Sequence, residues 1–87
     1  MTLHTATRRY LRDLCINSGL DTKVENGKII VNAVFGRYVI YYSGGKWYFY
    51  NFNDTLDELD LSDEESILRR LRTLKKRVDD LKERWKI

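Results

Sequence analysis

The apolar residues near the start of the chain recur with the period of a helix. Over residues 3–17 they form one stripe that includes Leu3, Tyr10 and Leu14. The opposite side carries three arginines, namely Arg8, Arg9 and Arg12. Gly19 follows at a position where a left-handed residue ends a helix at little cost. We therefore expect a helical segment over residues 1–19.

The apolar period changes to two in the next part of the chain, which is typical of β-strands. Asn26-Gly27 and Gly44-Gly45 stand between extended runs, and both pairs suit two-residue turns whose residues need positive φ. We expect an antiparallel meander of three or four strands over residues 22–52. The pattern leaves open whether residues 22–25 form the fourth strand.

Aromatic residues are concentrated in the second of these hairpins, residues 36–52. If Ser43 pairs with Lys46, both faces of the hairpin are apolar. One face carries the pairs Tyr42–Trp47, Ile40–Phe49 and Tyr38–Asn51, and the other carries Tyr41–Tyr48, Val39–Tyr50 and Arg37–Phe52. A sheet with one solvated face would alternate with polar residues. We therefore expect that one helix covers one face and that the second helix covers part of the other.

An amphipathic helix is predicted over residues 63–86. Its apolar residues are spaced alternately by four and three positions, so they form a stripe about 80° wide; they are Ile67, Leu71, Leu74, Val78, Leu81 and Trp85. Ser62 and Glu65 match a capping box, and residues 53–62 are predicted to be an acidic connector. The helix should be about 36 Å long, whereas a seven-residue strand spans only about 23 Å. Its C-terminal third should therefore extend beyond the sheet.

These elements predict a single α+β domain over residues 1–87, in the order helix, three strands, helix. The order resembles that of the double-stranded-RNA-binding domain over most of the chain. That family presents lysines at the start of its second helix to RNA phosphates, whereas the matching stretch here reads SDEESILRR and is acidic. The resemblance is therefore one of topology, and it does not imply the activity of the family.

Charge is segregated along the chain. Residues 1–53 carry seven basic and three acidic groups, residues 54–65 carry seven acidic and no basic groups, and residues 66–87 carry nine basic and three acidic groups. The formal charges of the three segments are therefore +4, −7 and +6, which add up to the net +3 of the chain. Such segregation says more about the charge of a partner than the small total does.

The heptad spacing of the C-terminal stripe also suits a coiled-coil seam. We expect a protein interface at its overhanging end, formed by Val78, Leu81 and Trp85 and flanked by Arg70, Arg77 and Arg84. A parallel homodimer would bring the arginines together, so self-association should be antiparallel, or the partner should be acidic. A second candidate surface for a protein partner is an acidic patch of Asp54, Asp57, Glu58 and Asp60.

Nucleic acid is the alternative partner. The run RRLRTLKKR and the N-terminal arginines offer cations for phosphates; the candidates are Arg69, Arg72, Lys75, Lys76, Arg8, Arg9 and Arg12. Asp79, Asp80 and Glu83 follow the run at once and would weaken such binding. The aromatic strands offer a different mode, in which their rings stack on single-stranded bases. Only Arg37 and Lys46 supply positive charge on those two strands.

Little in the sequence indicates catalysis. His4 is the only histidine and lies near a terminus that should fray, so a histidine-based nucleophilic site has nowhere to assemble. Cys15 is the only cysteine, so no internal disulfide can form. The sequence also contains no paired metal-ligand motif and no phosphate-binding glycine loop. We expect no enzyme activity, cofactor, metal site or small-molecule substrate. With no apolar run of signal-peptide or membrane-spanning length, the expected location is the cytoplasm.

The sequence therefore predicts a small, non-enzymatic protein that acts by binding another protein. One role that suits a compact domain of this kind is that of a phage or mobile-element accessory factor that inhibits a host enzyme. The alternative is a nucleic-acid-binding module that uses the basic C-terminal helix.

Overall fold

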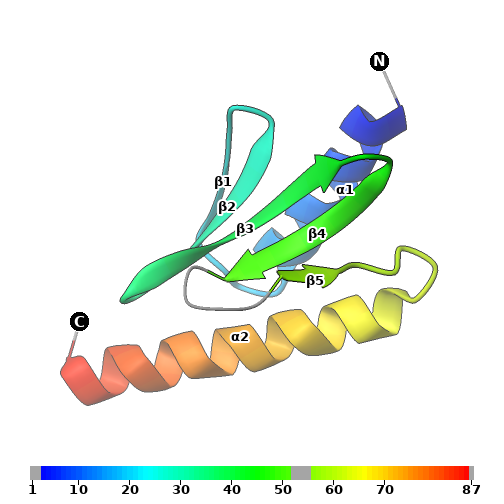
Figure 1. The fold of residues 1–87 in the computed structure, drawn as a ribbon. Coiled ribbons are helices and arrows are strands. Elements are labelled where there is room, and N and C mark those ends of the chain that lie inside the picture. Colours follow the sequence, from blue (N-terminus) through cyan, green and yellow to red (C-terminus); the bar gives the residue numbers. More distant parts are fainter. Residues whose placement is uncertain (1–2, 52–55, 87) are drawn as a thin grey trace.

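The structure is a computed structural model that describes residues 3–51 and 56–86. Its helices and strands follow one another as shown in Figure 1. In chain order they are α1 (Leu3–Asn17), β1 (Thr22–Glu25), β2 (Lys28–Ala33), β3 (Gly36–Ser43), β4 (Lys46–Asn51), β5 (Leu56–Glu58) and α2 (Glu64–Trp85). The two helices predicted over residues 3–17 and 63–86 are confirmed to within one residue at each end.

The strands form one antiparallel sheet in the order β1-β2-β3-β4-β5. The predicted α+β class and element order are confirmed, but the sheet has five strands where three or four were expected. Residues 22–25 are a true strand. The fifth strand comes from the predicted connector, residues 53–62, where Leu56 pairs with Tyr50 and Glu58 pairs with Tyr48. A three-residue strand is too short for a period of two to be recognised, so the sequence alone does not reveal β5.

Two tight turns determine the register of the sheet. Asn26 and Gly27 have φ values of 52° and 75°, and Gly44 and Gly45 have φ values of 58° and 84°. Positive φ at both central residues matches the twist of the flanking strands, so each hairpin closes with two residues. The predicted pairing of Ser43 with Lys46 is confirmed, together with the pairs that follow from it up to Tyr38–Asn51. The predicted pair Arg37–Phe52 lies outside the described residues.

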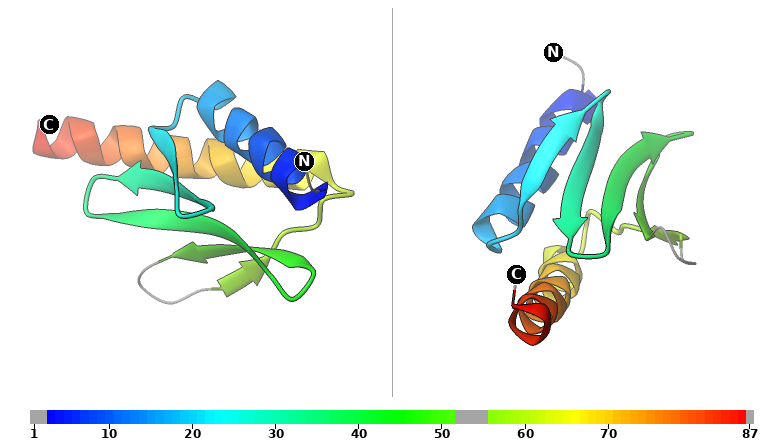
Figure 2. Two further views of the ribbon diagram at one scale, coloured as in Figure 1. Left: turned by 90° about the horizontal axis from the view of Figure 1, so that it is seen from above. Right: turned by 90° about the vertical axis from the view of Figure 1, so that its left-hand side faces the viewer.

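Both helices pack on the same face of the sheet, as the two views of Figure 2 show. The prediction that they divide between the two faces is therefore wrong. The reason is the width of the sheet. Five strands about 4.8 Å apart span about 19 Å, and a helix is about 10 Å across. Two helices therefore fit side by side on one face.

The core lies between this face and the helices. α1 contributes Leu11 and Cys15, and α2 contributes the first four residues of its apolar stripe, from Ile67 to Val78. The sheet contributes alternate residues, so their neighbours point to the opposite side. The buried members of the cluster are Leu11, Cys15, Leu20, Ile29, Val31, Ile40, Trp47, Phe49, Leu59, Ile67, Leu71, Leu74 and Val78.

Helix α2 begins one residue later than the predicted capping box implies. The carboxylate of Asp63 accepts a hydrogen bond from the backbone N–H of Ser66, at 3.1 Å, and so caps the helix. Ser62 is not the cap, because its hydroxyl donates to Asp60 within the preceding turn, at 2.5 Å. No helix in the described part of the chain is long and apolar enough to cross a membrane.

The overhang of α2 begins after Val78. Val78 is buried against the sheet, with only 5% of its surface exposed, whereas Trp85 is 59% exposed. The covered part of the apolar stripe therefore extends to Val78, and only the last two turns of the helix reach past the core.

Cys15 yields a prediction about reactivity. Its side chain is fully buried, and burial raises the pKa of the thiol from 9.0 to about 12. This change lowers the reactive thiolate fraction about 1000-fold. Alkylation of the native protein by iodoacetamide at mildly alkaline pH should therefore be at least about 1000-fold slower than alkylation in urea. Because the folded-state pKa is raised, the neutral thiol stabilises the fold below pH 9 and this contribution is lost as the pH rises toward 12.

The labelling rate is measured by intact-protein mass spectrometry, with Cys15→Ala as the control for modification elsewhere. Labelling of the native protein at the rate of a free thiol would contradict the buried position of Cys15.

Candidate binding surfaces

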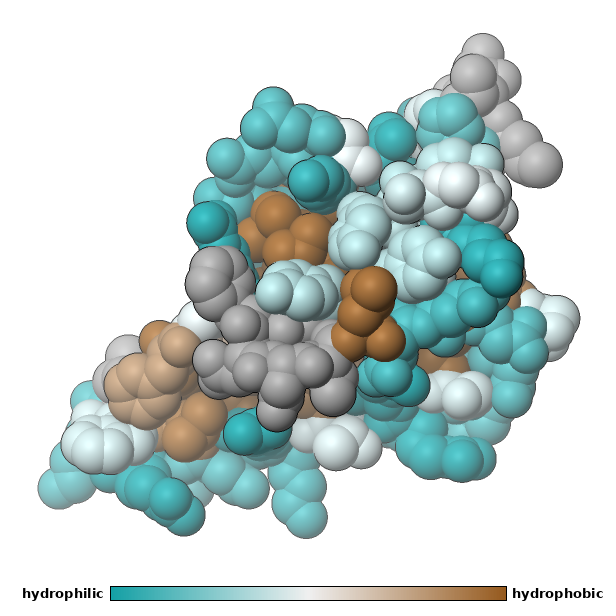
Figure 3. Space-filling model, viewed as in Figure 1, coloured by the Kyte–Doolittle hydropathy of each residue, from teal (hydrophilic) through white to brown (hydrophobic). Residues whose placement is uncertain are grey.

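One face of the sheet lies opposite both helices, and we call it the open face. The register places six apolar or aromatic side chains on it; they are Ile30, Val39, Tyr41, Tyr48, Tyr50 and Leu56. No described helix or strand lies over this face, and Figure 3 shows apolar surface there. The expectation that the second helix covers part of this face is therefore wrong for the described residues.

The side chains of the open face support one another. The rings of Tyr41 and Tyr48 lie 5.6 Å apart in a tilted pair, and the ammonium group of Lys28 is 5.9 Å from the centre of the Tyr41 ring. Ile30 is only 7% exposed although it belongs to this face, whereas Tyr50 is 39% exposed. Tyrosine rings tolerate such partial exposure to solvent, because their hydroxyl groups remain hydrated.

A hollow of about 330 Å³ opens on this face beside β2 and β3. Ile30, Val39, Tyr41 and Tyr50 line it, together with Glu25, Asn26, Lys28 and Arg37. The hollow is thus part apolar and part charged, with aromatic rings among its lining residues.

The charges on the open face are not balanced. Lys23 pairs with Glu25 at 3.2 Å, and Lys46 pairs more loosely with Glu58 at 3.7 Å. Lys28 and Arg37 have no carboxylate partner among residues 3–51 and 56–86. The open face therefore carries an excess of positive charge next to its aromatic rings.

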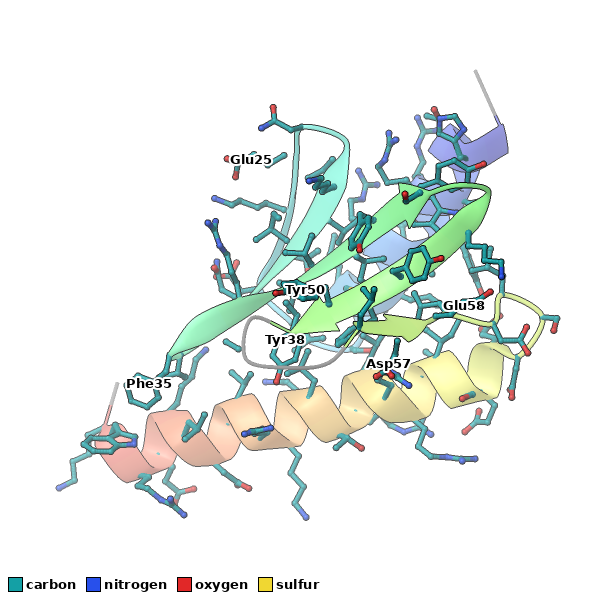
Figure 4. The ribbon with its side chains drawn as sticks, viewed as in Figure 1. Glu25, Phe35, Tyr38, Tyr50, Asp57 and Glu58 are labelled. Atoms are coloured by element: carbon teal, nitrogen blue, oxygen red, sulfur yellow. The ribbon has the colours of Figure 1, made fainter. Side chains whose placement is uncertain are left out.

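A second exposed surface lies at the C-terminal end of α2, and we call Phe35, Leu81 and Trp85 the aromatic tip. The rings of Phe35 and Trp85 meet edge to face, with centres 5.6 Å apart and an angle of 88°. Phe35 is 66% exposed and Trp85 59% exposed, while Leu81 is half-buried. Figure 4 places Phe35, from the turn between β2 and β3, beside the last turn of the helix.

The tip differs from the interface predicted from the sequence. Val78 is buried in the core and is not available to a partner, so its assignment to the interface is wrong. Phe35 was missed, because the sequence shows a large apolar residue in a turn but not what it contacts. Arg77 and Arg84 are exposed beside the tip as expected.

Arg70 belongs to the fold and not to an exposed flank. Its guanidinium donates to Asp57 of β5 at 2.6 Å, and it lies 5.4 Å from the centre of the Phe49 ring. Because Asp57 pairs with Phe49 across β4 and β5, one arginine ties the short edge strand to α2.

Two of the three described carboxylates of the predicted acidic patch form ion pairs within the chain, and the third stays charged. Asp57 binds Arg70, and Glu58 pairs with Lys46. Asp60 accepts hydrogen bonds from the hydroxyl and the backbone N–H of Ser62, and these bonds lower the pKa of its carboxyl group. Asp54 lies outside the described residues. The patch therefore offers fewer free carboxylates than the sequence indicates.

The basic residues of the predicted nucleic-acid surface lie on two helices, and three of them form ion pairs. On α2, Arg72 binds Glu65 at 2.8 Å, which lowers the pKa of that carboxyl group, and Lys75 binds Asp79 at 2.7 Å. Arg69 and Lys76 remain exposed. On α1, Arg12 pairs with Asp13 at 3.0 Å and Arg9 is exposed. Arg8 is half-buried, and a side chain at Gly27 would touch its guanidinium group.

The described residues show no grouping typical of a catalytic or metal centre. No cluster of three His, Cys, Asp or Glu side chains in this part of the chain is arranged to hold a metal ion. His4 stacks on Tyr42, with ring centres 4.8 Å apart, and Cys15 is enclosed in the core.

Comparison with known proteins identifies no relative. No family model matches the chain, and no curated protein or solved structure is significantly similar to it. The binding surfaces are therefore interpreted from their own chemistry.

The link between Arg70 and Asp57 can be tested by substitution. Both side chains are more than a third exposed, so Asp57→Asn should lower the free energy of unfolding by less than about 1 kcal/mol. Arg70→Ala should lower it by about 1–2 kcal/mol, because it also removes the packing and the cation–π contact over Phe49.

Urea denaturation measures both changes. Arg69→Ala is the matched control, since this neighbouring arginine is exposed, and it should stay within about 0.5 kcal/mol of the wild type. Equal losses from Arg69→Ala and Arg70→Ala would show that the contact does not stabilise the sheet edge.

Proposed function

We propose that this chain is a non-enzymatic binding protein that docks on an acidic surface of another protein through the aromatic tip. The observation that carries the proposal is the pair of exposed rings, Phe35 and Trp85, at the end of α2. Large aromatic side chains are rarely left in water in contact with each other, and tryptophan is enriched among the residues that dominate binding energy.

The charges around the tip support the acidic nature of the partner. Four basic residues of the last turns of α2 are exposed and form no ion pair with any residue in the described ranges; they are Arg77, Lys82, Arg84 and Lys86. Asp80 and Glu83 are exposed in the same turns, so the excess of positive charge beside the tip is two and not four. A net positive surrounding of an apolar centre favours a partner with carboxylates around an apolar pocket, because such complementarity speeds association and excludes other partners.

The same charges disfavour a homodimer through the tip. In a two-fold symmetric contact each patch meets its own copy, so two surfaces with the same net positive charge would approach each other. The tip is also small. Two rings and a half-buried leucine cannot supply the roughly 800 Å² per partner of a typical specific interface. The basic side chains must therefore contribute part of the buried area.

That this chain is a phage or mobile-element factor that inhibits a host enzyme stays a prediction from the sequence. Its location in the cytoplasm is likewise a prediction from the sequence. The predicted nucleic-acid-binding role of the basic helix finds less support, because Arg72 and Lys75 are held by acidic neighbours.

The proposal is tested by comparing the wild type with Trp85→Ala. Tagged forms of both are exposed to proteins of the native host, and a protein bound by the wild type but not by the variant is identified, purified and titrated by calorimetry. Loss of a central tryptophan should weaken binding about 30-fold. Arg84→Glu should slow association and reduce its dependence on salt.

Tyr50→Ala is the matched control, because it removes an exposed ring from the open face and leaves the tip intact. Binding that survives Trp85→Ala but not Tyr50→Ala would reject the tip as the interface. A concentration-dependent dimer in light scattering that Trp85→Ala abolishes would reject the acidic partner in favour of self-association.

A further inference from the structure

We infer that the open face binds a single strand of nucleic acid, with one base seated in the hollow between Tyr41 and Tyr50. The surface is distinct from the aromatic tip, so the inference does not depend on the function proposed above. It rests on the aromatic walls and the apolar floor of the hollow, and on two cations that have no carboxylate partner among residues 3–51 and 56–86.

The walls suit a planar base. Tyr41 and Tyr50 lie on adjacent strands and are diagonal neighbours, because Tyr41 pairs with Tyr48 and Tyr50 pairs with Val39. Such neighbours are about 7–8 Å apart at the backbone, and both side chains line the hollow, so a base that enters it meets an aromatic ring on either strand. Tyr41 already contacts Tyr48 and Lys28. Little side-chain conformational entropy is therefore lost when a base stacks on it.

The floor and the size of the hollow fit the same ligand. Ile30 and Val39 are paired across β2 and β3 and give the hollow an apolar base. Its volume of about 330 Å³ is near the lower limit for ligand sites. The hollow therefore suits one base of a strand better than a large compact ligand.

The unpaired cations lie where a backbone would cross the hollow. Lys28 and Asn32 are four positions apart on β2, and Arg37 pairs with Asn32. Lys28 and Arg37 are therefore separated by about 13 Å along the strands, with the hollow between them. Glu25 also lines the hollow, but Lys23 balances its charge. A phosphate on each side of the seated base would complement the two cations.

Other occupants fit the open face less well. A second copy would bring the same positive excess of Lys28 and Arg37 against itself. A nucleic-acid duplex keeps its bases stacked inside and offers mainly phosphates, so it would not use the tyrosine walls. A protein partner has no need of a slot for a flat ring. A single strand uses the walls, the floor and both cations at once.

The inference is tested by fluorescence anisotropy with labelled single-stranded DNA and RNA of about ten nucleotides, a length within the range that small folds bind. We expect saturable binding at low salt, and weaker binding to a duplex of the same sequence. If Lys28 and Arg37 each neutralise one phosphate, a fourfold rise in salt should weaken binding about sevenfold.

Substitutions separate the open face from the rest of the surface. Tyr50→Ala should weaken single-strand binding about 5- to 100-fold, because a stacking ring is lost, whereas Tyr50→Phe should retain it. Arg37→Ala should weaken binding and flatten the salt dependence, and Arg37→Lys should largely restore both. Circular dichroism and thermal melting establish that each variant is folded.

The controls are Trp85→Ala at the aromatic tip and the paired change Arg69→Ala with Lys76→Ala on the outer side of α2. Both should bind the single strand as the wild type does. Three results would overturn the inference: no saturable binding to any single strand at low salt, equal affinity of Tyr50→Ala and the wild type, or a loss confined to the α2 variant. The last result would assign the nucleic acid to the basic helix.

Discussion

The packing of two helices against one face of a single sheet determines how the rest of this molecule is arranged. A sheet of five strands offers about 19 Å of width, and α1 and α2 together need nearly all of it. β1 and β5 are the strands that add this width, although they have only four and three residues. The edge strands are therefore short in length but decisive for the layer structure.

One consequence is that the apolar side chains are divided between two environments. Those facing the helices form a closed core around Ile29, Ile40 and Leu71, each at most 1% exposed. Those facing away include tyrosines that keep their hydroxyl groups in water while their rings pack on neighbours. Lysine side chains assist here, because their aliphatic stems cover apolar surface while the ammonium group stays solvated. The open face is thus stable enough to remain uncovered and apolar enough to bind.

The fold could be predicted in large part because its signals are local. Asn26-Gly27 and Gly44-Gly45 specify two turns, and the turns specify the register of the strands between them. The spacing from Ile67 to Val78 likewise identifies the buried stripe of α2. Each of these depends on residues close together in the chain.

The parts that could not be predicted depend on contacts between distant residues. β5 is held by pairing with β4 and by the link from Arg70 to Asp57, and neither appears in a periodic pattern. The aromatic tip depends on how far the sheet reaches along α2, which decides that Val78 is covered while Trp85 is not. The rule that an apolar face must be covered also failed, since it treats tyrosine as equivalent to phenylalanine.

The strand order has a consequence for how the chain folds. Each strand is hydrogen-bonded to its neighbour in sequence, so the meander can zip up from adjacent hairpins without closing a long loop, and the entropy lost at each step stays small. Helix α2 follows all five strands in the chain. During synthesis the sheet therefore emerges before the helix that completes its core. Until α2 docks, the nascent sheet exposes part of its inner face as well as its outer one, and this is the interval in which the chain is most prone to aggregate.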